Sequence, residues 1–534
     1  MFTLSDTQRF SLTILALALT SLTASLSVTS LSNALPVIVT ELDGTDIEAF
    51  WAGTAYVLCS AVFQPSFAIF SHIFGRQPLF AAAFLFFLTG SAIATAARNF
   101  SILLAARAVQ GTGGGGLITL SEILIADLVP LRERGKWIGL LSMMWAVGSL
   151  TGPIIGGALA HERVWRWLFA LNLPLASASF VAISICLSPR IQRNDYRQAL
   201  SRVDWAGFAI FIPSLASLLI PITWGGEMFP WSSWHTLVPI SLGIFGLTLF
   251  TVCETWIARE PFLLRSIFWE WNPKLIYLQT FCHGVLVWSL LYYLPLYYQG
   301  VKGLSPLMSG VAILPETCTI SATAGAAGLL ITTSGRYRWA LWAGWLVTTT
   351  GLGLLYLLDV DCPTYRWVII NLTVGVGMGS LFTSTNLAIQ AKISVNELSS
   401  ALGFFAFFRT LGQAVGLAVG GTVFHNMFDR NLPAEPSILS LTRGHGLDAA
   451  PLIGVVNAIP QEDPRKHKII YAYAEALRIL WLVLCGFSAL GLLASFFTKG
   501  YSLEPWDNRA HRTDVDDYLE SVPPDVALVS GKGD

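Results

Sequence analysis

Long apolar runs follow one another along nearly the whole chain, and short polar segments separate them. The runs cover 10–37, 49–70, 78–97, 101–128, 136–160, 166–188, 204–224, 235–257, 273–298, 305–332, 338–358, 365–390, 397–425 and 470–497. A helix needs about 20 apolar residues to cross a bilayer. The apolar core of a secretory signal peptide has only about 7–15, so the first run is too long to be one. The pattern therefore predicts fourteen membrane-spanning helices, numbered here as spans 1–14, in an all-α integral membrane protein.

Basic residues favour one orientation of these spans. If the N-terminus is cytosolic, 19 of the 32 Lys and Arg residues fall in cytosolic segments and five in the short outer loops. Five more lie in the long 426–469 loop, and long loops count little in the positive-inside rule. We therefore predict that both termini are cytosolic.

Glycines repeat between the two ends of the chain at a constant interval. Spans 4 and 5 share them with spans 12 and 13, each 264 residues later: Gly111/Gly375, Gly113/Gly377, Gly115/Gly379, Gly148/Gly412, Gly152/Gly416, Gly156/Gly420. GRQP at 75 also recurs as GRYR at 335. An even number of spans separates matching elements, so the two halves are parallel. We predict two parallel six-helix bundles, with spans 7 and 8 as an inserted hairpin.

These boundaries divide the chain into five parts. They are a cytosolic N-tail (1–9), an N-terminal bundle (10–188), a linker with two extra membrane helices (189–272), a C-terminal bundle with an extracellular loop at 426–469 (273–497), and a disordered cytosolic tail (498–534).

The stretch RAVQGTGGGG at 107–116 contains G-x-G-x-x-G, which is typical of dinucleotide-binding turns. Such a turn follows a strand and opens a helix. Here the glycines lie inside an apolar span and recur in span 12. Small residues let membrane helices approach closely, so we interpret the stretch as a packing face.

Composition agrees with a membrane protein and excludes several functions. Charged residues make up 12% of the chain, against about 25% in soluble proteins. The net charge of −1 indicates no nucleic-acid partner. The seven cysteines are scattered without a C-x-x-C, and we find no H-E-x-x-H or G-x-S-x-G motif. We therefore predict no metal, no cofactor and no enzyme activity.

Several motifs resemble those of one family. RAVQGTGGGG is similar to its span-4 motif, GSLTGPIIGG at 148–157 matches its span-5 antiporter motif, and WRWLFALNLP at 165–174 resembles its span-6 motif. Over about 10–497 the chain resembles the major facilitator superfamily, specifically its fungal 14-spanner drug:proton antiporters. That resemblance implies a major facilitator fold and a proton-coupled exporter of small amphipathic organic molecules that works by alternating access.

Alternative functions remain. They are a proton symporter or exchanger for a defined metabolite or siderophore, and a transporter-fold receptor. The resemblance further implies a monomer in the plasma membrane, with a vacuolar or other internal membrane as the alternative.

The chain departs from the family pattern at two positions. His72 and Ser27 stand where the family commonly has acids, in the loop after span 2 and in span 1. The missing acid in span 1 leaves the coupling mechanism open. We predict that His72 is neutral and weakens the gate, while a plain surface histidine is the alternative.

The resemblance and the cost of charges within a bilayer select candidate site residues. Arg107 and Glu122 are candidates for proton coupling, and snorkelling to the two interfaces is the alternative for both. A cytosolic gate is expected from His72, Gly75, Arg76 and Asp127, with an Arg76–Asp127 ion pair. The antiporter helix carries Gly148, Gly152, Pro153, Gly156 and Gly157. The substrate cavity is expected to contain Ser27, Asn33, Gln110, His283, Trp288, Glu316, Asn386, Arg409 and Gln413.

Overall fold

A computed structural model describes most of the chain. The described residues are 5–187, 203–225, 228–256, 267–268, 270–394, 397–432, 453, 459–460 and 463–503. Their regular structure is helical, apart from an isolated bridge between Gly225 and Phe229. Most of the predicted loop 426–469 and of the predicted tail lies outside the described residues.

The helices follow the predicted spans in order. They are α1 (Asp6–Thr29), α2 (Leu31–Glu41), α3 (Asp46–Phe74), α4 (Arg76–Thr95), α5 (Phe100–Leu128), η1 (Leu131–Glu133), α6 (Arg134–His161), α7 (Trp167–Ala170), α8 (Asn172–Cys186), α10 (Trp205–Trp224), α11 (Trp234–Trp256), α13 (Trp271–Gly300), α14 (Pro306–Ser334), α15 (Arg338–Leu355), α16 (Thr364–Gln390), α17 (Leu398–Asn431) and α20 (Pro464–Phe497).

Two predicted spans are interrupted helices. Span 1 is divided into α1 and α2 at Ser30, and span 6 into α7 and α8 at Leu171. Within the described residues, eleven helical segments are long and apolar enough to cross a membrane. The helices α5, α14 and α15 are not among them. The count of fourteen spans therefore stays a prediction.

Local sequence signals explain where several helices begin and end. Ser5 and Thr45 form capping boxes at α1 and α3, and the Asn99 side chain caps α5. Gly75 has φ 93° between α3 and α4, and Gly335 has φ 66° after α14. Glycine adopts positive φ without the steric cost that a Cβ brings, so both sharp turns suit it.

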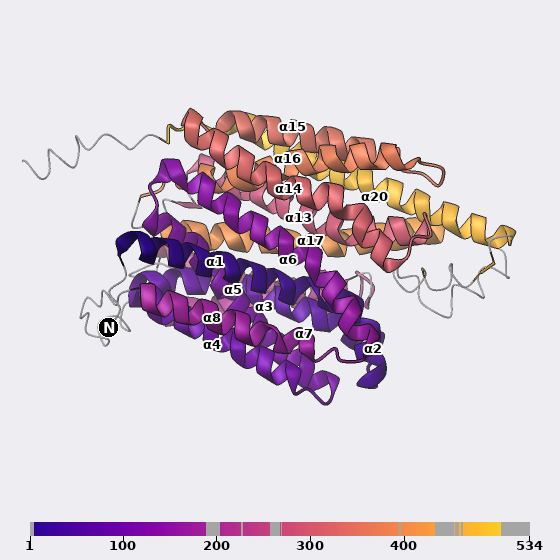
Figure 1. Ribbon diagram of the computed structural model, residues 1–534, viewed down its shortest axis with the longest axis horizontal. Coiled ribbons are helices and arrows are strands. Elements are labelled where there is room, and N and C mark those ends of the chain that lie inside the picture. The colour runs from indigo at the N-terminus through magenta and orange to yellow at the C-terminus, as the bar shows by residue number, and fades with distance from the viewer. Residues whose placement is uncertain are drawn as a thin grey trace, which may run out of the picture.

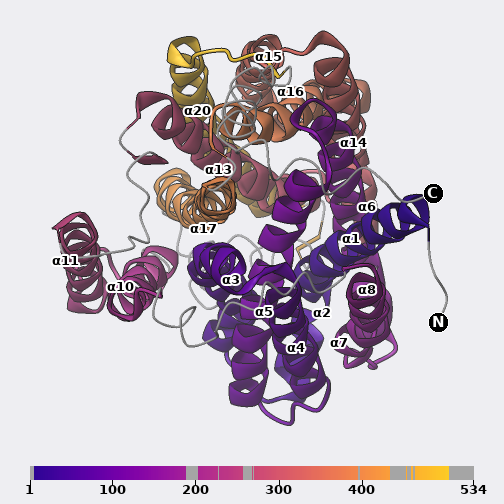
Figure 2. The same cartoon turned by 90° about the vertical axis from the view of Figure 1, so that its left-hand side faces the viewer.

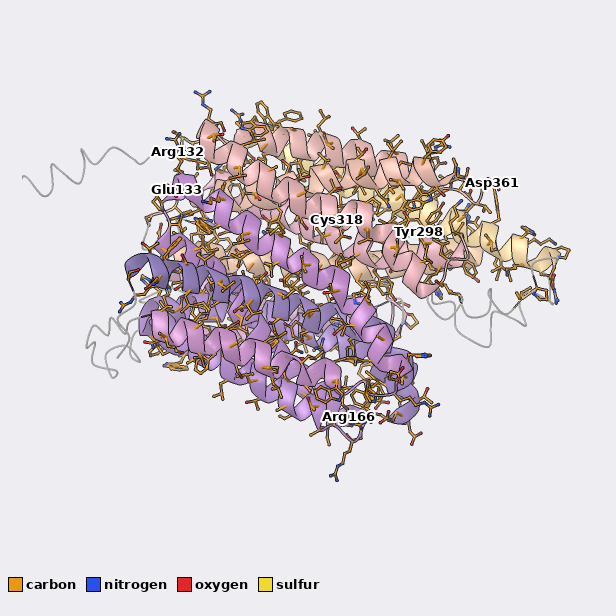
Figure 3. The ribbon with its side chains drawn as sticks, viewed as in Figure 1. Arg132, Glu133, Arg166, Tyr298, Cys318 and Asp361 are labelled. Atoms are coloured by element: carbon orange, nitrogen blue, oxygen red, sulfur yellow. The ribbon has the colours of Figure 1, made fainter. Side chains whose placement is uncertain are left out.

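The helices form two layers (Figure 1). The N-terminal half, α1 to α8, makes one layer, and the C-terminal half, α13 to α20, makes the other. In Figure 2 the pair α10 and α11 lies at one side, where α10 contacts α3 and α17. Arg132 and Glu133 mark one end of the molecule, and Arg166 and Asp361 mark the other (Figure 3). We call these the Arg132 end and the Arg166 end.

The repeated glycines have equivalent neighbours in the two halves. A Cβ at Gly113 would lie 2.5 Å from the carbonyl oxygen of Ala83 in α4, and one at Gly377 would lie 2.5 Å from the Thr348 nitrogen in α15. Likewise Gly111 faces α3 and Gly375 faces α14. The helices α5 and α16 therefore pack backbone to backbone on their partners. Because α5 follows another helix and not a strand, it is not a dinucleotide-binding turn.

Candidate functional site

The two halves touch through glycines at the Arg132 end. A Cβ at Gly135 of α6 would lie 2.9 Å from the Gly328 oxygen of α14, and one at Gly139 would lie 2.8 Å from the Gly325 Cα. Next to them the Arg132 Nε donates to the Thr332 carbonyl, 3.0 Å away. The helices α6 and α14 are therefore in backbone contact at this end.

A largely buried chain of polar side chains joins the halves beside that contact. Glu122 of α5 lies 3.4 Å from Arg409 of α17 and accepts a hydrogen bond from Asn386 of α16 at 3.1 Å. Asn386 in turn accepts from Gln390, whose Oε1 accepts from Arg134 at 2.8 Å. We call these five residues the interhalf network. It crosses between the halves at Glu122 and again at Arg134, so separating them at this end breaks it.

The ion pair in this network is held loosely. Its N–O distance of 3.4 Å exceeds the ~2.7–2.9 Å of a short charge-assisted hydrogen bond. The Arg409 Nε and Nη2 atoms have no hydrogen-bond partner among the described residues. Its guanidinium instead lies 4.1 Å from the Phe382 ring centre and 4.5 Å from that of Phe405. Arg409 thus keeps spare donors in a buried aromatic setting.

Arg107 lies in a different place, within the N-terminal half. It is fully buried and donates to the carbonyls of Ala52 at 3.0 Å and Ser27 at 3.1 Å, and to Gln110 at 2.6 Å. Its guanidinium also lies 4.5 Å from the Tyr56 ring centre. These oxygen partners are all neutral. Arg107 therefore ties α5 to α1 and α3 without a carboxylate partner among the described residues.

The structure does not bring the two candidate coupling residues together. Glu122 follows Arg107 by fifteen positions, which is about 22 Å along a helix at 1.5 Å per residue. Glu122 faces the C-terminal half and pairs with Arg409, while Arg107 bonds within its own half. They form two separate buried sites.

The predicted gate residues surround the turn at Gly75. Arg76 lies 2.7 Å from Asp127, at the end of α5, and donates to Ser71 of α3 at 2.6 Å. It also donates to Ser399 of α17 at 2.7 Å. His72 is exposed on the last turn of α3. One guanidinium thus links two helices of the N-terminal half to the other half, although its role as a gate stays a prediction.

Replacing Arg76 with glutamine should open the Arg132 end. The change removes a solvent-exposed ion pair with Asp127, which contributes about 1 kcal/mol or less, and the charged donor to buried Ser399, which contributes about 1.5–3 kcal/mol. We expect a cysteine at Leu387, which is buried beside Gly135, to react about tenfold faster with a polar thiol reagent, in a background without the seven natural cysteines.

Ser399→Ala is the control for this change. It keeps the pair between Arg76 and Asp127 and loses one hydrogen bond. It should therefore accelerate labelling less than Arg76→Gln. Equal labelling of Arg76→Gln and the unaltered protein would show that this arginine does not hold the end closed.

The glycines of the span-5 motif pack on the break between α1 and α2. A Cβ at Gly148 would lie 2.7 Å from the Ser25 Cβ, and one at Gly156 would lie 3.0 Å from the Ser30 carbonyl carbon. Gly152 faces Thr29, Pro153 lies inside α6, and Gly157 is half-buried. Close approach of α6 to this break leaves no room for larger side chains on that face.

The remaining cavity candidates are spread over both halves. In the C-terminal half, buried His283 lies 3.1 Å from the Met378 carbonyl, Glu316 is buried, and Trp288 and Gln413 are half-buried. In the other half, Gln110 and Ser27 bind Arg107. The side chain of Asn33 lies outside the described part of the structure.

Three residues in these contacts were missed by sequence reasoning. Arg134 counts only as a loop charge in the sequence, Ser399 is one of many serines, and Tyr56 lies in an apolar run. Their partners are Gln390, Arg76 and Arg107. Nothing in their local sequence separates them from neighbouring residues of the same types.

Comparison with known proteins gives one consistent family. The family model described as Major Facilitator Superfamily matches residues 17–417. "MFS transporter L2" of Phoma sp. is 42% identical over 93% of this chain and 83% of its own length. "Efflux pump FUS6" of Gibberella fujikuroi is 34% identical over 93% of this chain and 90% of its own length.

Solved structures show the same fold at low identity. The proton:xylose symporter XylE has a TM-score of 0.61 at 13% identity, covering 94% of this chain and 98% of its own. The human organic anion transporter MFSD10 has a TM-score of 0.57 at 17% identity, covering 93% and 100%. With two layers of membrane helices and a family match over most of its length, the chain belongs to the major facilitator superfamily.

Proposed function

We propose that this multi-pass membrane transporter is a proton-coupled exporter of small amphipathic organic molecules that works by alternating access. The observation that carries the proposal is the Glu122–Arg409 pair, a titratable contact buried between the two halves. The relatives support export, because one with 34% identity is named an efflux pump. The span-5 glycines supply the close helix packing that the antiporter motif implies.

The interhalf network suggests how a proton drives the cycle. Ionised Glu122 attracts Arg409 and holds the Arg132 end closed. When the Glu122 carboxylate takes a proton, an O–H bond forms and the attraction between full charges is lost. Removing one partner of a buried ion pair destabilises the conformation that contains the pair by about 3–5 kcal/mol. The Arg132 end then opens, and the proton leaves to water on that side.

The sidedness and the site of action complete the proposal. Basic residues concentrate in the segments at the Arg132 end, which the positive-inside rule assigns to the cytosol. Both termini are then cytosolic, fourteen helices span the plasma membrane, and the closed end faces the cytosol. The two six-helix bundles of one monomer move relative to each other and open the two ends in turn. The helices α10 and α11 are an added hairpin outside the two bundles.

Replacing Glu122 with glutamine should uncouple export from the proton gradient. The amide keeps the shape of the side chain but carries no charge and binds no proton. In cells that lack their own pumps, we expect the unaltered protein to lower the retention of amphipathic dyes until a protonophore is added. The Glu122→Gln variant should give no gradient-driven export at equal membrane abundance.

The control is Glu475→Gln in α20, whose carboxylate pairs with Arg478 at 2.5 Å within one helix. Adjacent pairs of this kind contribute about 0.5 kcal/mol or less, so export should persist. Concentrative export by Glu122→Gln would contradict the coupling role. Gradient-driven accumulation of a compound inside the cell would instead favour the symporter.

A further inference from the structure

Glu316 is a buried acid whose setting differs from that of Glu122. It lies ten residues into α14, about 15 Å from the start of that helix. Its side chain is 4% exposed, and it forms no salt bridge within the described residues. Its Oε2 atom also lacks a hydrogen-bond partner there. Glu122, by contrast, has both Arg409 and Asn386.

An ionised carboxylate in this setting would be strongly disfavoured. Burying a charge without a partner costs so much that the group binds a proton and becomes neutral instead. Acids at membrane depth normally pair with a base or face a water-filled path. With a side chain that is only 4% exposed, Glu316 has little contact with solvent. The structure therefore favours the neutral carboxylic acid at this position.

The neighbours of Glu316 fit a protonated acid. Asn371 of α16 donates to the Tyr298 hydroxyl at 2.6 Å and to the Ala312 carbonyl at 3.3 Å, which uses both hydrogens of its amide. The Asn371 Oδ1 acceptor has no partner among the described residues. Ala312, whose carbonyl accepts from Asn371, lies one helical turn before Glu316 on α14, and long helical side chains lean toward the preceding turn.

The groups around Glu316 are polar but carry no positive charge. Tyr298 of α13 lies within electrostatic reach of it. Asn371 is the residue of α16 in this cluster. The helix α6 also packs on α14, but its described basic residues lie near the two ends of α6. A protonated carboxyl at Glu316 would carry the hydrogen-bond donor that the Asn371 Oδ1 acceptor lacks.

We propose that Glu316 is a second proton-binding site, which is occupied in this conformation and releases its proton when α14 moves away from α13 and α16. On release the O–H bond breaks, the proton passes to water, and the carboxylate remains where it can be hydrated. This site extends the proton coupling proposed above and rests on that proposal for its role in transport.

The structure of α14 links this site to the contact between the halves. Pro315, directly before Glu316, lacks the N–H that would bond the Val311 carbonyl, so the helix bends most easily here. Beyond this point α14 reaches the Arg132 end, where Gly328 touches α6 and Thr332 accepts from Arg132. Opening that end therefore moves the part of α14 that follows Glu316 in the sequence.

Infrared difference spectroscopy tests the site without any substrate. The spectra of the unaltered protein and of each variant, purified in lipid at neutral pH, are subtracted from one another. Exposed acids are ionised under these conditions, whereas a buried protonated acid has its own carbonyl band. We expect such a band in the unaltered protein and its loss in Glu316→Gln. It should persist in Glu122→Gln and in Glu475→Gln. Absence of the band, or a band that Glu316→Gln leaves unchanged, would overturn the proposal.

A second variant keeps the test decisive if Glu316→Gln folds poorly. Asn371→Leu retains the acid and removes the Oδ1 acceptor. The band should therefore stay and move to higher frequency, and an unmoved band would contradict the contact. These spectra need no transport, so their failure leaves the export proposal standing. Loss of coupling in Glu122→Gln is likewise independent of them.

Discussion

Replacing Gly113 with alanine should lower the stability of the protein by about 1–3 kcal/mol or more, the usual cost of overpacking. The new Cβ would lie 2.5 Å from the Ala83 carbonyl oxygen, which is backbone of α4. A flexible side chain could turn aside, but here two whole helices must separate. Thermal unfolding in lipid or detergent measures the effect, and the yield of folded protein should fall with it.

Two comparisons sharpen this prediction. At Gly53 of α3 a Cβ meets nothing within 4 Å, so Gly53→Ala should match or exceed the natural stability, since alanine is the better helix former by about 1 kcal/mol. Gly377→Ala, at the equivalent place in the other half, should destabilise like Gly113→Ala. Similar stability of the Gly53 and Gly113 variants would refute the backbone-packing account.

Replacing Arg107 with alanine should abolish transport while the protein still inserts into the membrane. The change removes two hydrogen bonds that join α5 to α1 and α3, and a third to Gln110 within α5. Each hydrogen bond of a charged group contributes about 1.5–3 kcal/mol to the stability of the arrangement that it holds. If that energy is lost from the transport cycle, each 1.4 kcal/mol slows transport about tenfold. Transport assays at matched surface abundance should show a loss of about 100-fold or more.

Variants at two positions show whether geometry or charge matters. Arg107→Lys keeps the charge but replaces a planar fork by a single ammonium, so it should also lose most of the activity. Arg166→Ala removes an exposed pair with Glu41 at the Arg166 end, and such pairs contribute about 1 kcal/mol or less. It should transport normally. Activity near the natural level in Arg107→Ala would exclude a functional role for this arginine.

The helical fold could be predicted because each span is a continuous apolar run. The 264-residue interval correctly paired Gly113 with Gly377, which pack on equivalent helices. The break at Ser30 was not predictable, because Ser30 lies within an apolar run and its conformation is still helical. What distinguishes it is the close approach of Gly156, a contact between residues far apart in the sequence.

The candidate site was only partly predictable. Residues such as Glu122 and Arg409 were selected singly, because an ionisable group within a span is costly wherever it lies. Their pairing depends on how the two halves face each other, across 287 positions of sequence. For the same reason the contact of Arg76 with Ser399, 323 positions away, could not be predicted. The pairing of Arg76 with Asp127 was predicted from the family motif.

The glycine contact between α6 and α14 also bears on the speed of the transport cycle. Gly135 and Gly328 meet through their backbones, so at this point of contact no interlocked side chains must change rotamer before the helices part. The activation barrier to opening the Arg132 end then comes mainly from the Glu122–Arg409 pair and from the polar links of Arg76, Arg132 and Arg134. Substitutions at these arginines should alter turnover more than affinity, which makes this end the natural place to tune transport rate.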